Sequence, residues 1–360
     1  MDHAATTKIC DAAKQKIIQH LDDFANPSSS HELGRQARVL IEDARERIAK
    51  CINANPEYIY FTSGGSEANT LALNNKNNTA SSKFEHHSVV TDWPKISITK
   101  DGFIKSHKLN NMLSEWWERP FAVMSCMHVN NEIGTIQPIK ELATIAHRYG
   151  ILFHTDAVQS IPYIPIDVKD IGCDMLSASG HKFGAPKGIG FLYANERSRI
   201  KPIINGGHQE GGMRPGTENV LGIVAMATAL EDTVQHMEER NAYVKLLRDN
   251  LLEKLLKIDG ACLNGSLENR VSGNINIRFV GVSGARLVTL CSLYGIYISS
   301  GSACNEGQAI PSHVLKAIGL TDEEALSSVR ITIGHENTEE EIDMAANIIT
   351  KLVGRIRNEE

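Results

Sequence analysis

The sequence predicts an α/β protein in which helices flank a mainly parallel sheet and a smaller α/β unit lies beside it. In the first half, short apolar runs bounded by glycine or polar residues alternate with longer stretches of helical pattern. That alternation is typical of βαβ units, whose strands run parallel. The apolar runs are YIYFTS at 58–63, FAVMSCM at 121–127, ILFHT at 151–155, DMLSAS at 174–179 and GFLYA at 190–194.

The segment between the second and third runs predicts a crossover helix. Ile139, Leu142 and Ile145 recur at helical spacing, and Gly150 is a typical residue just past a helix C-terminus. Such a helix carries the chain back for the next parallel strand. The polar stretch LNNKNNTASSK at 73–83 is instead expected to form a surface loop.

The second half changes character after a long, largely helical connection from Thr217 to about Ile258. Strand-like and helical patterns then alternate, which predicts the smaller α/β unit. They are VSGNINIRFV at 271–280, ARLVTLCSLYG at 285–295, IYISSGSAC at 296–304, SSVRITIG at 327–334 and a helical stretch from Glu339 onward.

Composition limits the class of protein. A chain of 360 residues with 42% hydrophobic residues has enough apolar side chains for one large core, or for one large and one smaller core. The formal net charge of -6 gives no basic bias of the kind that phosphate backbones attract. We therefore expect no direct nucleic-acid substrate.

Cysteine usage and hydropathy indicate a compartment. The seven cysteines are irregularly spaced without a CxxC pair, which argues against a disulfide framework and suits a reducing environment. The N-terminal MDHAATTKIC lacks a charged n-region and an apolar h-region, and no run approaches the roughly 20 apolar residues of a membrane span. We expect a cytoplasmic protein without membrane association. The histidines do not cluster with cysteines at ligand spacing, so no metal site is expected.

The most specific segment is SASGHKFGAPKGIG at 177–190, which delivers His181 and Lys182 from a strand end to a glycine-rich turn. A lysine in a desolvated setting retains a neutral amine near neutral pH and can form a Schiff base. The alternative is a solvated surface lysine. The neighbouring residues favour the Schiff base.

A carboxylate follows another strand in ILFHTDAVQS at 151–160. Asp156 ends that strand, and Gln159 stands three residues later, so both could face one ligand. A buried carboxylate beside a pyridine nitrogen keeps that nitrogen protonated and makes the ring an electron sink. Taken alone, Asp156 serves equally well as a helix N-cap.

Two further segments carry chemistry. FTSGGSEANTLAL at 61–73 runs from a strand through Gly64 and Gly65 into a helix, where backbone N–H groups and the Ser66 hydroxyl could bind a phosphate. The alternative is that SGGS forms a plain turn.

Cys304 lies among small polar residues in SSGSACNEGQAIPSH, which predicts an exposed loop thiol rather than a buried one.

Together these motifs resemble the cysteine desulfurases of the NifS/IscS type, which belong to the class V aminotransferases with the pyridoxal-phosphate (PLP) fold type I. The resemblance covers nearly the whole chain. The matching motifs are DHAATT at 2–7, NPSSSH at 26–31, FTSGGSEANTLA at 61–72, MHVNNEIG at 127–134, TDAVQS at 155–160, SGHK at 179–182, MRPGTEN at 213–219, SSGSAC at 299–304 and SSVRITIG at 327–334.

The resemblance implies a role for each matched residue around the cofactor ring. Lys182 is the expected Schiff-base lysine, Asp156 the partner of the pyridine nitrogen and Gln159 the partner of the phenolic oxygen. His86 is expected to stack on the ring and transfer protons. Asn131 is an expected cofactor or substrate contact.

The same resemblance implies a phosphate site shared between two chains. Gly65, Ser66, Ser179 and His181 are expected to cradle the phosphate. In the family, the threonine that matches Thr217 reaches this phosphate from the second subunit. A homodimer with shared active sites is therefore expected.

For the substrate, the resemblance implies L-cysteine, whose α-carboxylate Arg330 would bind through its planar, charged fork, with Asn26 as a second contact. The alternative for Arg330 is a surface arginine on an edge strand. Cys304 is the expected nucleophile, and the products would be L-alanine and a Cys304 persulfide. A sulfur-acceptor protein, such as an iron–sulfur scaffold or a thiolation enzyme, would take up the sulfur.

The implied domain boundaries place the large PLP-binding domain at 12–245, and residues 1–11 with 246–360 in a small domain that carries the cysteine loop. Two rival functions stay open. A selenocysteine lyase or another class V aminotransferase would use the same scaffold, although transamination needs no thiol. A non-catalytic scaffold that binds a partner would not need all six of the residues Lys182, Asp156, Gln159, His86, Arg330 and Cys304.

Overall fold

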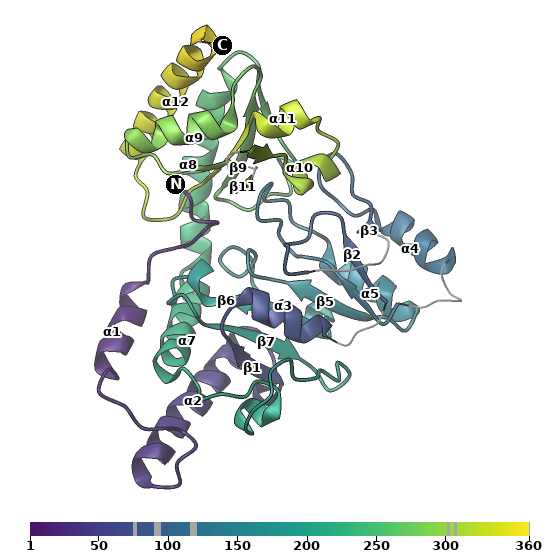
Figure 1. The fold of residues 1–360 in the computed structure, drawn as a ribbon, viewed down its shortest axis with the longest axis vertical. Coiled ribbons are helices and arrows are strands. Elements are labelled where there is room, and N and C mark those ends of the chain that lie inside the picture. Colours follow the sequence, from purple (N-terminus) through teal and green to yellow (C-terminus); the bar gives the residue numbers. More distant parts are fainter. Residues whose placement is uncertain (75–77, 90–94, 116–120, 301–302, 306–307, 360) are drawn as a thin grey trace.

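The computed structural model describes residues 1–74, 78–89, 95–115, 121–300, 303–305 and 308–359, and it gives no side chains for 303–309. Figure 1 shows two lobes joined by the long helix α8 (Met237–Leu256). The lower lobe contains a large sheet, and the upper lobe contains a smaller sheet and both chain termini. The α/β class predicted from the sequence is confirmed.

The larger sheet of the described chain has seven strands in the order β1-β7-β6-β5-β4-β2-β3. Strands β6, β5, β4, β2 and β3 run parallel to one another, while β7 runs antiparallel to both of its neighbours. The sheet is therefore mainly parallel, as predicted. The strands are β1 (Ile59–Thr62), β2 (Thr79–Ser82), β3 (Lys95–Ile96), β4 (Val123–Ser125), β5 (Leu152–Asp156), β6 (Met175–Ser179) and β7 (Gly190–Ala194).

Helices cover this sheet and each other. Helix α3 packs on β6 and β7, α5 packs on β5, and α1 and α2 pack on α7. In α5 the apolar residues of its predicted face are buried, and Gly150 after it has a left-handed φ of 70°. The elements are α1 (Asp11–Gln19), α2 (Glu32–Cys51), α3 (Gly65–Leu73), α4 (Ser106–Glu115), α5 (Ile139–Arg148), α6 (Val168–Ile171), α7 (Val220–Gln235) and the 3-10 turns η1 (Pro56–Tyr58), η2 (Gly180–Lys182) and η3 (Gln209–Gly212).

The upper lobe contains a four-stranded antiparallel sheet in the order β10-β13-β9-β8. Helices α8 and α9 pack on this sheet, and α12 packs on both of these helices. The predicted order of strands and helices in this half is confirmed. The elements are β8 (Ala261–Leu263), β9 (Asn274–Phe279), α9 (Gly284–Leu293), β10 (Ser299–Ser300), α10 (His313–Ala317), α11 (Asp322–Leu326), β13 (Ser328–Thr332) and α12 (Glu339–Glu359).

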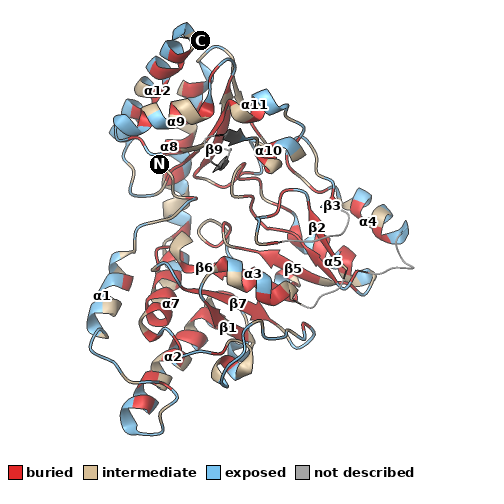
Figure 2. Cartoon of the chain, in the orientation of Figure 1, coloured by how far each residue is buried: buried red, intermediate tan, exposed pale blue. Residues whose placement is uncertain are grey.

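Figure 2 shows that buried residues fill the interior of both lobes. One buried apolar cluster draws its residues from Ala13 to Leu230, and a second draws its residues from Val244 to Ile356. Helix α8 spans the predicted boundary between residues 245 and 246, so that boundary stays a prediction. Among the helices of the described ranges, none combines the length and apolar character of a bilayer span.

The expected surface loop at 73–83 is wrong for its second half. Residues Thr79–Ser82 form β2, which lies between β3 and β4 and is buried along its whole length. These small residues lack the apolar alternation that usually identifies a strand, but their size lets them pack inside the sheet. Residues 75–77 lie outside the described chain.

Candidate active site

Ten of the residues singled out from the sequence line one cavity of about 360 Å³. The cavity lies where β5 and β6 end, and strand ends in parallel sheets are the usual place for ligands. These ten residues are Gly65, Ser66, His86, Asn131, Asp156, Gln159, Ser179, His181, Lys182 and Arg330.

Lys182 enters the cavity from η2, directly after β6. Its Nζ donates hydrogen bonds to the carbonyl oxygens of Ala4 at 2.6 Å and Ala5 at 2.7 Å. Burial, and secondly the positive charge of Arg330, lower the pKa of Lys182 from 10.5 to about 8. The amine is therefore partly neutral near neutral pH, as a Schiff-base lysine requires. The surface-lysine alternative does not match this position.

Asp156 ends β5 and is only 2% exposed. Its Oδ1 accepts a hydrogen bond from the backbone N–H of Val158 at 2.9 Å, and its Oδ2 accepts one from Asn69 Nδ2 at 2.8 Å. The local capping contact considered from the sequence is thus present, but the carboxyl group also borders the cavity. Burial raises its pKa, opposed by these hydrogen bonds and by the charges of His86 and Lys182.

A chain of hydrogen bonds joins Asp156 to His86. Asn69 Nδ2 also donates to Ser88 Oγ at 2.8 Å, and Ser88 Oγ lies 2.7 Å from Nδ1 of His86. The backbone N–H of Ser88 donates to the same nitrogen at 3.1 Å, so Nδ1 is an acceptor. Burial lowers the pKa of His86, which favours a neutral ring held in one orientation.

Sequence reasoning missed Asn69 and Ser88. Asn69 stands three residues after Ser66 on α3, and residues three apart share one face of a helix. This spacing could have predicted that Asn69 faces the same cavity as Ser66.

The start of α3 forms one wall of the cavity. A Cβ on Gly65 would lie 2.7 Å from Cγ2 of Val158 and 3.4 Å from Cβ of Ser179, so glycine is required for this close approach. His181 Nδ1 lies 3.1 Å from Oγ1 of Thr6, and burial lowers the pKa of His181 to about 4. The helix start with its free N–H groups suits a phosphate.

Arg330 reaches the cavity from β13, in the interior of the smaller sheet. Its Nη2 pairs with Oδ1 of Asp2 at 2.9 Å, and its Nη1 donates to the carbonyl oxygen of Asn131 at 3.1 Å. Its side chain is 11% exposed, and within the described residues its buried Nε has no hydrogen-bond partner. The alternative of a surface arginine on an edge strand is therefore wrong.

The N-terminal segment at 2–7 closes the cavity on one side. The carbonyl oxygen of Ala4 accepts from Gln159 Nε2 at 2.9 Å as well as from Lys182, and Thr7 bonds to the carbonyl oxygen of His181. The DHAATT motif matches the family, but the sequence alone indicates no role for it. Its contacts join the first residues of the chain to the end of β6.

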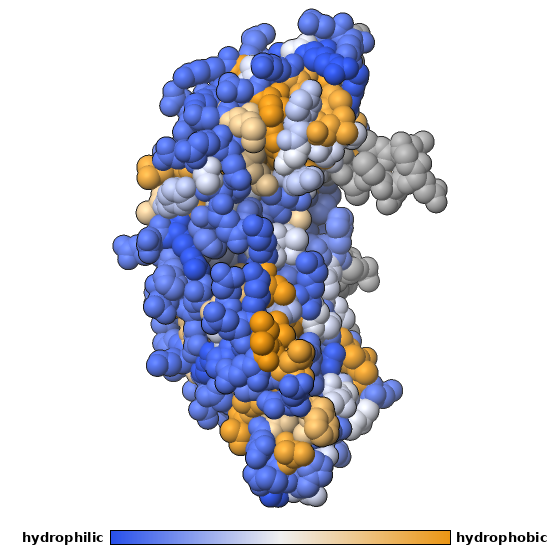
Figure 3. All heavy atoms as spheres, turned by 90° about the vertical axis from the view of Figure 1, so that its left-hand side faces the viewer, coloured by the Kyte–Doolittle hydropathy of each residue, from blue (hydrophilic) through white to orange (hydrophobic). Residues whose placement is uncertain are grey.

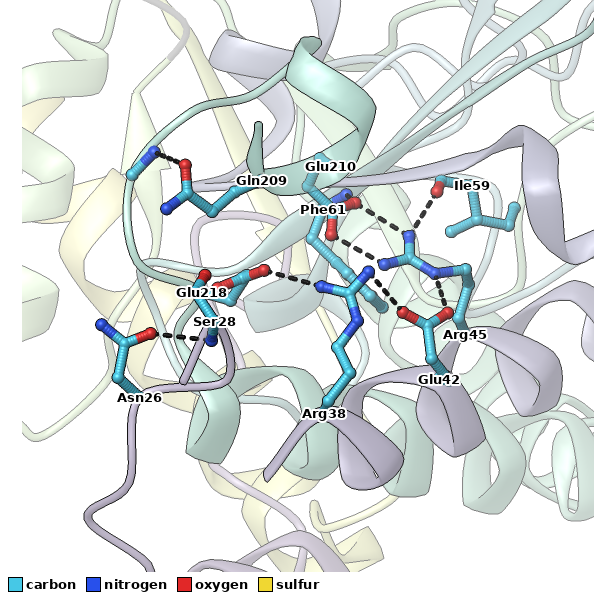
Figure 4. Close-up of polar contacts among 11 residues, drawn as sticks. Asn26, Ser28, Arg38, Glu42, Arg45, Ile59, Phe61, Gln209, Glu210 and Glu218 are labelled. Carbon is cyan, nitrogen blue, oxygen red and sulfur yellow. Dashed lines mark hydrogen bonds and ion pairs between the residues drawn. The ribbon is translucent and has the colours of Figure 1, made fainter. Parts of the chain in front are cut away.

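Two predicted residues, Asn26 and Thr217, are not among the residues that line this cavity. Asn26 is exposed, and its Oδ1 accepts a hydrogen bond from the backbone N–H of Ser28 at 2.9 Å (Figure 4). Thr217 is exposed between η3 and α7. The backbone of Cys304 lies in β11 (Ala303–Asn305), paired with β12 (Gln308–Ile310). The backbone on both sides of 306–307 thus forms a short antiparallel strand pair where a loop was expected, while the exposure of Cys304 stays a prediction because its side chain lies outside the described residues.

Comparisons with known proteins agree with this geometry. Residues 1–344 match the family model described as aminotransferase class-V. The chain is 38% identical to the cysteine desulfurase IscS of Dictyoglomus turgidum, over 99% of this chain and 95% of that protein.

Solved structures of similar proteins have the same fold as this chain. A NifS-like protein from Rickettsia africae ESF-5 superimposes with a TM-score of 0.90 at 33% identity, covering 99% of this chain and 98% of that one. A structure of SspA in complex with cysteine gives a TM-score of 0.79 at 34% identity, covering 94% and 99%. This chain therefore belongs to the class V aminotransferase family, among the PLP-dependent cysteine desulfurases of the NifS/IscS type.

Proposed function

We propose that this protein converts L-cysteine to L-alanine, keeps the sulfur as a persulfide on Cys304 and passes it to an acceptor protein. One observation carries the proposal: a single cavity gathers a lysine of lowered pKa, a buried carboxyl group and a guanidinium group. These are the side chains of Lys182, Asp156 and Arg330. A protein that only bound a partner would not need this set.

The residues around the cavity fit PLP. The buried carboxyl of Asp156 suits the pyridine nitrogen, Gln159 the phenolic oxygen, and the amine of Lys182 the aldehyde. Gly65 leaves room at the helix start for the phosphate. When bound, the protonated pyridine ring withdraws electrons from the Cα of an attached amino acid.

The substrate would be oriented by Arg330. Its guanidinium group is already placed by Asp2 and Asn131, so little side-chain freedom is lost when it binds the α-carboxylate of cysteine. The solved structure of SspA holds cysteine in a related chain, which supports this substrate class. His86, held at Nδ1 by Ser88, would stack on the ring and move the proton of the substrate.

We propose a homodimer in which Thr217 and Asn26 complete the site of the partner. Both are exposed and outside the cavity of their own chain. Figure 3 shows apolar side chains gathered on the lower part of the face that carries α1. Ile18 is 72% exposed, Leu21 63% and Phe24 87%, in the segment that leads to Asn26. Exposed apolar groups of this size are typical of a protein interface. Sedimentation equilibrium of the purified chain tests the dimer.

The experiment that tests the main proposal compares the wild type with Cys304→Ala. We expect wild-type protein with PLP to release alanine and, with a reductant present, sulfide from L-cysteine. Cys304→Ala should bind PLP with the same absorbance but lose sulfide release. Cys262→Ala removes another partly exposed free thiol, in β8, and should retain both activities.

Each failure identifies a rival. Full activity of Cys304→Ala would remove the persulfide step and favour a lyase or transaminase, and a strong preference for selenocysteine over cysteine would favour selenocysteine lyase. A wild type that neither binds PLP nor releases alanine would favour the non-catalytic scaffold. The proposed acceptors serve iron–sulfur clusters, thio-cofactors or tRNA thiolation in the cytoplasm, and mass spectrometry of ³⁴S-labelled candidates tests the transfer.

A further inference from the structure

The segment that carries Thr217 is bound to the rest of the chain by pairs of arginine and carboxylate side chains. We define the Thr217 segment as residues 209–218, from the start of η3 to the residue after Thr217. Two of its carboxylates pair with α2, and one of its arginines pairs with α3. Figure 4 shows the contacts with α2.

The most buried of these contacts is a bidentate salt bridge between Arg45 and Glu210. Nη2 of Arg45 donates to Oε1 of Glu210 at 2.7 Å, and Nη1 donates to Oε2 at 2.8 Å. The backbone N–H of Phe61 donates to the same Oε2 at 2.9 Å, and the guanidinium lies 4.7 Å from the Phe61 ring centre. Both side chains are buried, so the pair fixes one end of the Thr217 segment against β1.

The backbone at Glu210 is strained. Its φ of 49° and ψ of 42° lie in the left-handed region, which non-glycine residues seldom adopt. Such a conformation persists only where its surroundings hold it, and it is found preferentially at ligand-binding sites. The Arg45 pair supplies the holding contact here.

The other end of the segment is held by Arg38. Its Nη1 donates to Oε1 of Glu218 at 3.0 Å, and its Nη2 pairs with Glu42 at 2.8 Å. Glu42 in turn accepts from Nε of Arg45 at 2.9 Å. The three α2 residues stand four and three positions apart, so they lie on one helix face and form a continuous line of charges under the segment.

A third contact joins the segment to the cavity of its own chain. Arg214 Nε donates to Oε1 of Glu67 at 2.9 Å, and Glu67 Oε2 accepts from the backbone N–H of Ser63. Glu67 follows Ser66 at the start of α3. Along the chain, Thr217 therefore lies between two residues that are held by salt bridges, Arg214 and Glu218.

We propose that Arg45 and Arg38 are positioning residues for cofactor binding, because they hold Thr217 where it contacts the phosphate in the site of the partner subunit. The inference rests on the proposed role of Thr217. Gly216, with φ of 103°, and the glycines at 211 and 212 would otherwise let this segment sample many conformations. Fixing it beforehand lowers the entropy lost when the phosphate is bound.

The test compares affinities for PLP and for pyridoxal, which lacks the phosphate, in dimeric apo-protein. The variant is Arg38→Gln, because Arg38 is half exposed at 44% and its loss should not prevent folding. The matched control is Arg47→Gln on the same helix. Arg47 pairs with Glu231 of α7 at 2.9 Å and does not touch the Thr217 segment.

We expect Thr217→Ala to reduce the ratio of PLP to pyridoxal affinity by about tenfold, which is the effect of losing one hydrogen bond to a charged group. Arg38→Gln should reduce the same ratio by about threefold or more, and adding it to Thr217→Ala should cause little further loss. Arg47→Gln should leave the ratio unchanged. General damage would weaken both ligands equally.

Two outcomes would contradict the inference, and they distinguish a failure of the positioning role from a failure of the proposed Thr217 contact. If Thr217→Ala lowers the ratio but Arg38→Gln does not, the positioning role is wrong and the proposed role of Thr217 stands. If Thr217→Ala leaves the ratio unchanged, the proposed contact to the phosphate is refuted, and the positioning role with it.

Discussion

Cofactor capture by the apo-protein should depend on pH through Lys182. Only a neutral amine attacks an aldehyde, and burial lowers the pKa of Lys182 from 10.5 to about 8. The rate of PLP capture should therefore rise with pH, reach half of its maximum near pH 8 and level off above about pH 9. Arg330→Gln removes the second cause of the lowered pKa and should move the midpoint to higher pH.

The expected size follows from the two pKa values. At pH 7.5 an amine of pKa 8 is neutral in about a quarter of molecules, whereas an amine of pKa 10.5 is neutral in about one molecule in a thousand. The structure therefore predicts capture about 200-fold faster than with an ordinary lysine. Above pH 9 the predicted rate is nearly constant, whereas an ordinary lysine would still gain about tenfold per pH unit.

Stopped-flow absorbance of apo-protein mixed with PLP measures this rate between pH 6 and 10. Reaction of PLP with methylamine over the same range corrects for the titration of PLP itself. A rate that keeps rising tenfold per unit above pH 9 would refute the lowered pKa. A midpoint unchanged in Arg330→Gln would show that burial alone lowers it.

Two other substitutions test the structure. Burial raises the pKa of Glu85 from 4.5 to about 8, so the folded protein keeps a proton that the unfolded chain has released between these values. Stability should fall as the pH rises through this window, by at most about 1.4 kcal/mol per unit, and urea unfolding should show a flatter profile for Glu85→Gln. Gly65→Ala places a Cβ 2.7 Å from Val158 and should weaken PLP binding about tenfold by titration. Gly354→Ala, with open space around it in α12, is the control, and equal affinities would contradict the steric account.

Much of the cavity was predictable because its residues lie next to strand ends. Asp156 ends β5, and Lys182 follows β6 by three residues. Carboxyl ends of parallel strands meet at one edge of a sheet, so local pattern was enough to place these side chains together. The start of α3 at Gly65 follows from the same strand-to-helix reasoning.

Other features could not be predicted from local pattern. The strand Thr79–Ser82 is polar and small, and only its place between β3 and β4 makes it a buried strand. The paired strands β11 and β12 likewise have no alternating apolar pattern. In both cases pairing with a neighbouring strand outweighs the preference of the segment itself.

The sequence by itself determined the class of fold, the order of its elements and most residues of the cavity, because periodicity and strand-end motifs are local properties. Only the tertiary structure decided that Lys182 donates a hydrogen bond to the carbonyl oxygen of Ala4 and that Asn69 and Ser88 join Asp156 to His86. It also decided that Arg45 forms a salt bridge with Glu210, 165 positions away. These contacts depend on how the chain brings distant segments together. The lowered pKa of Lys182 belongs to the same group, because desolvation and the charge of a distant arginine exist only in the folded protein.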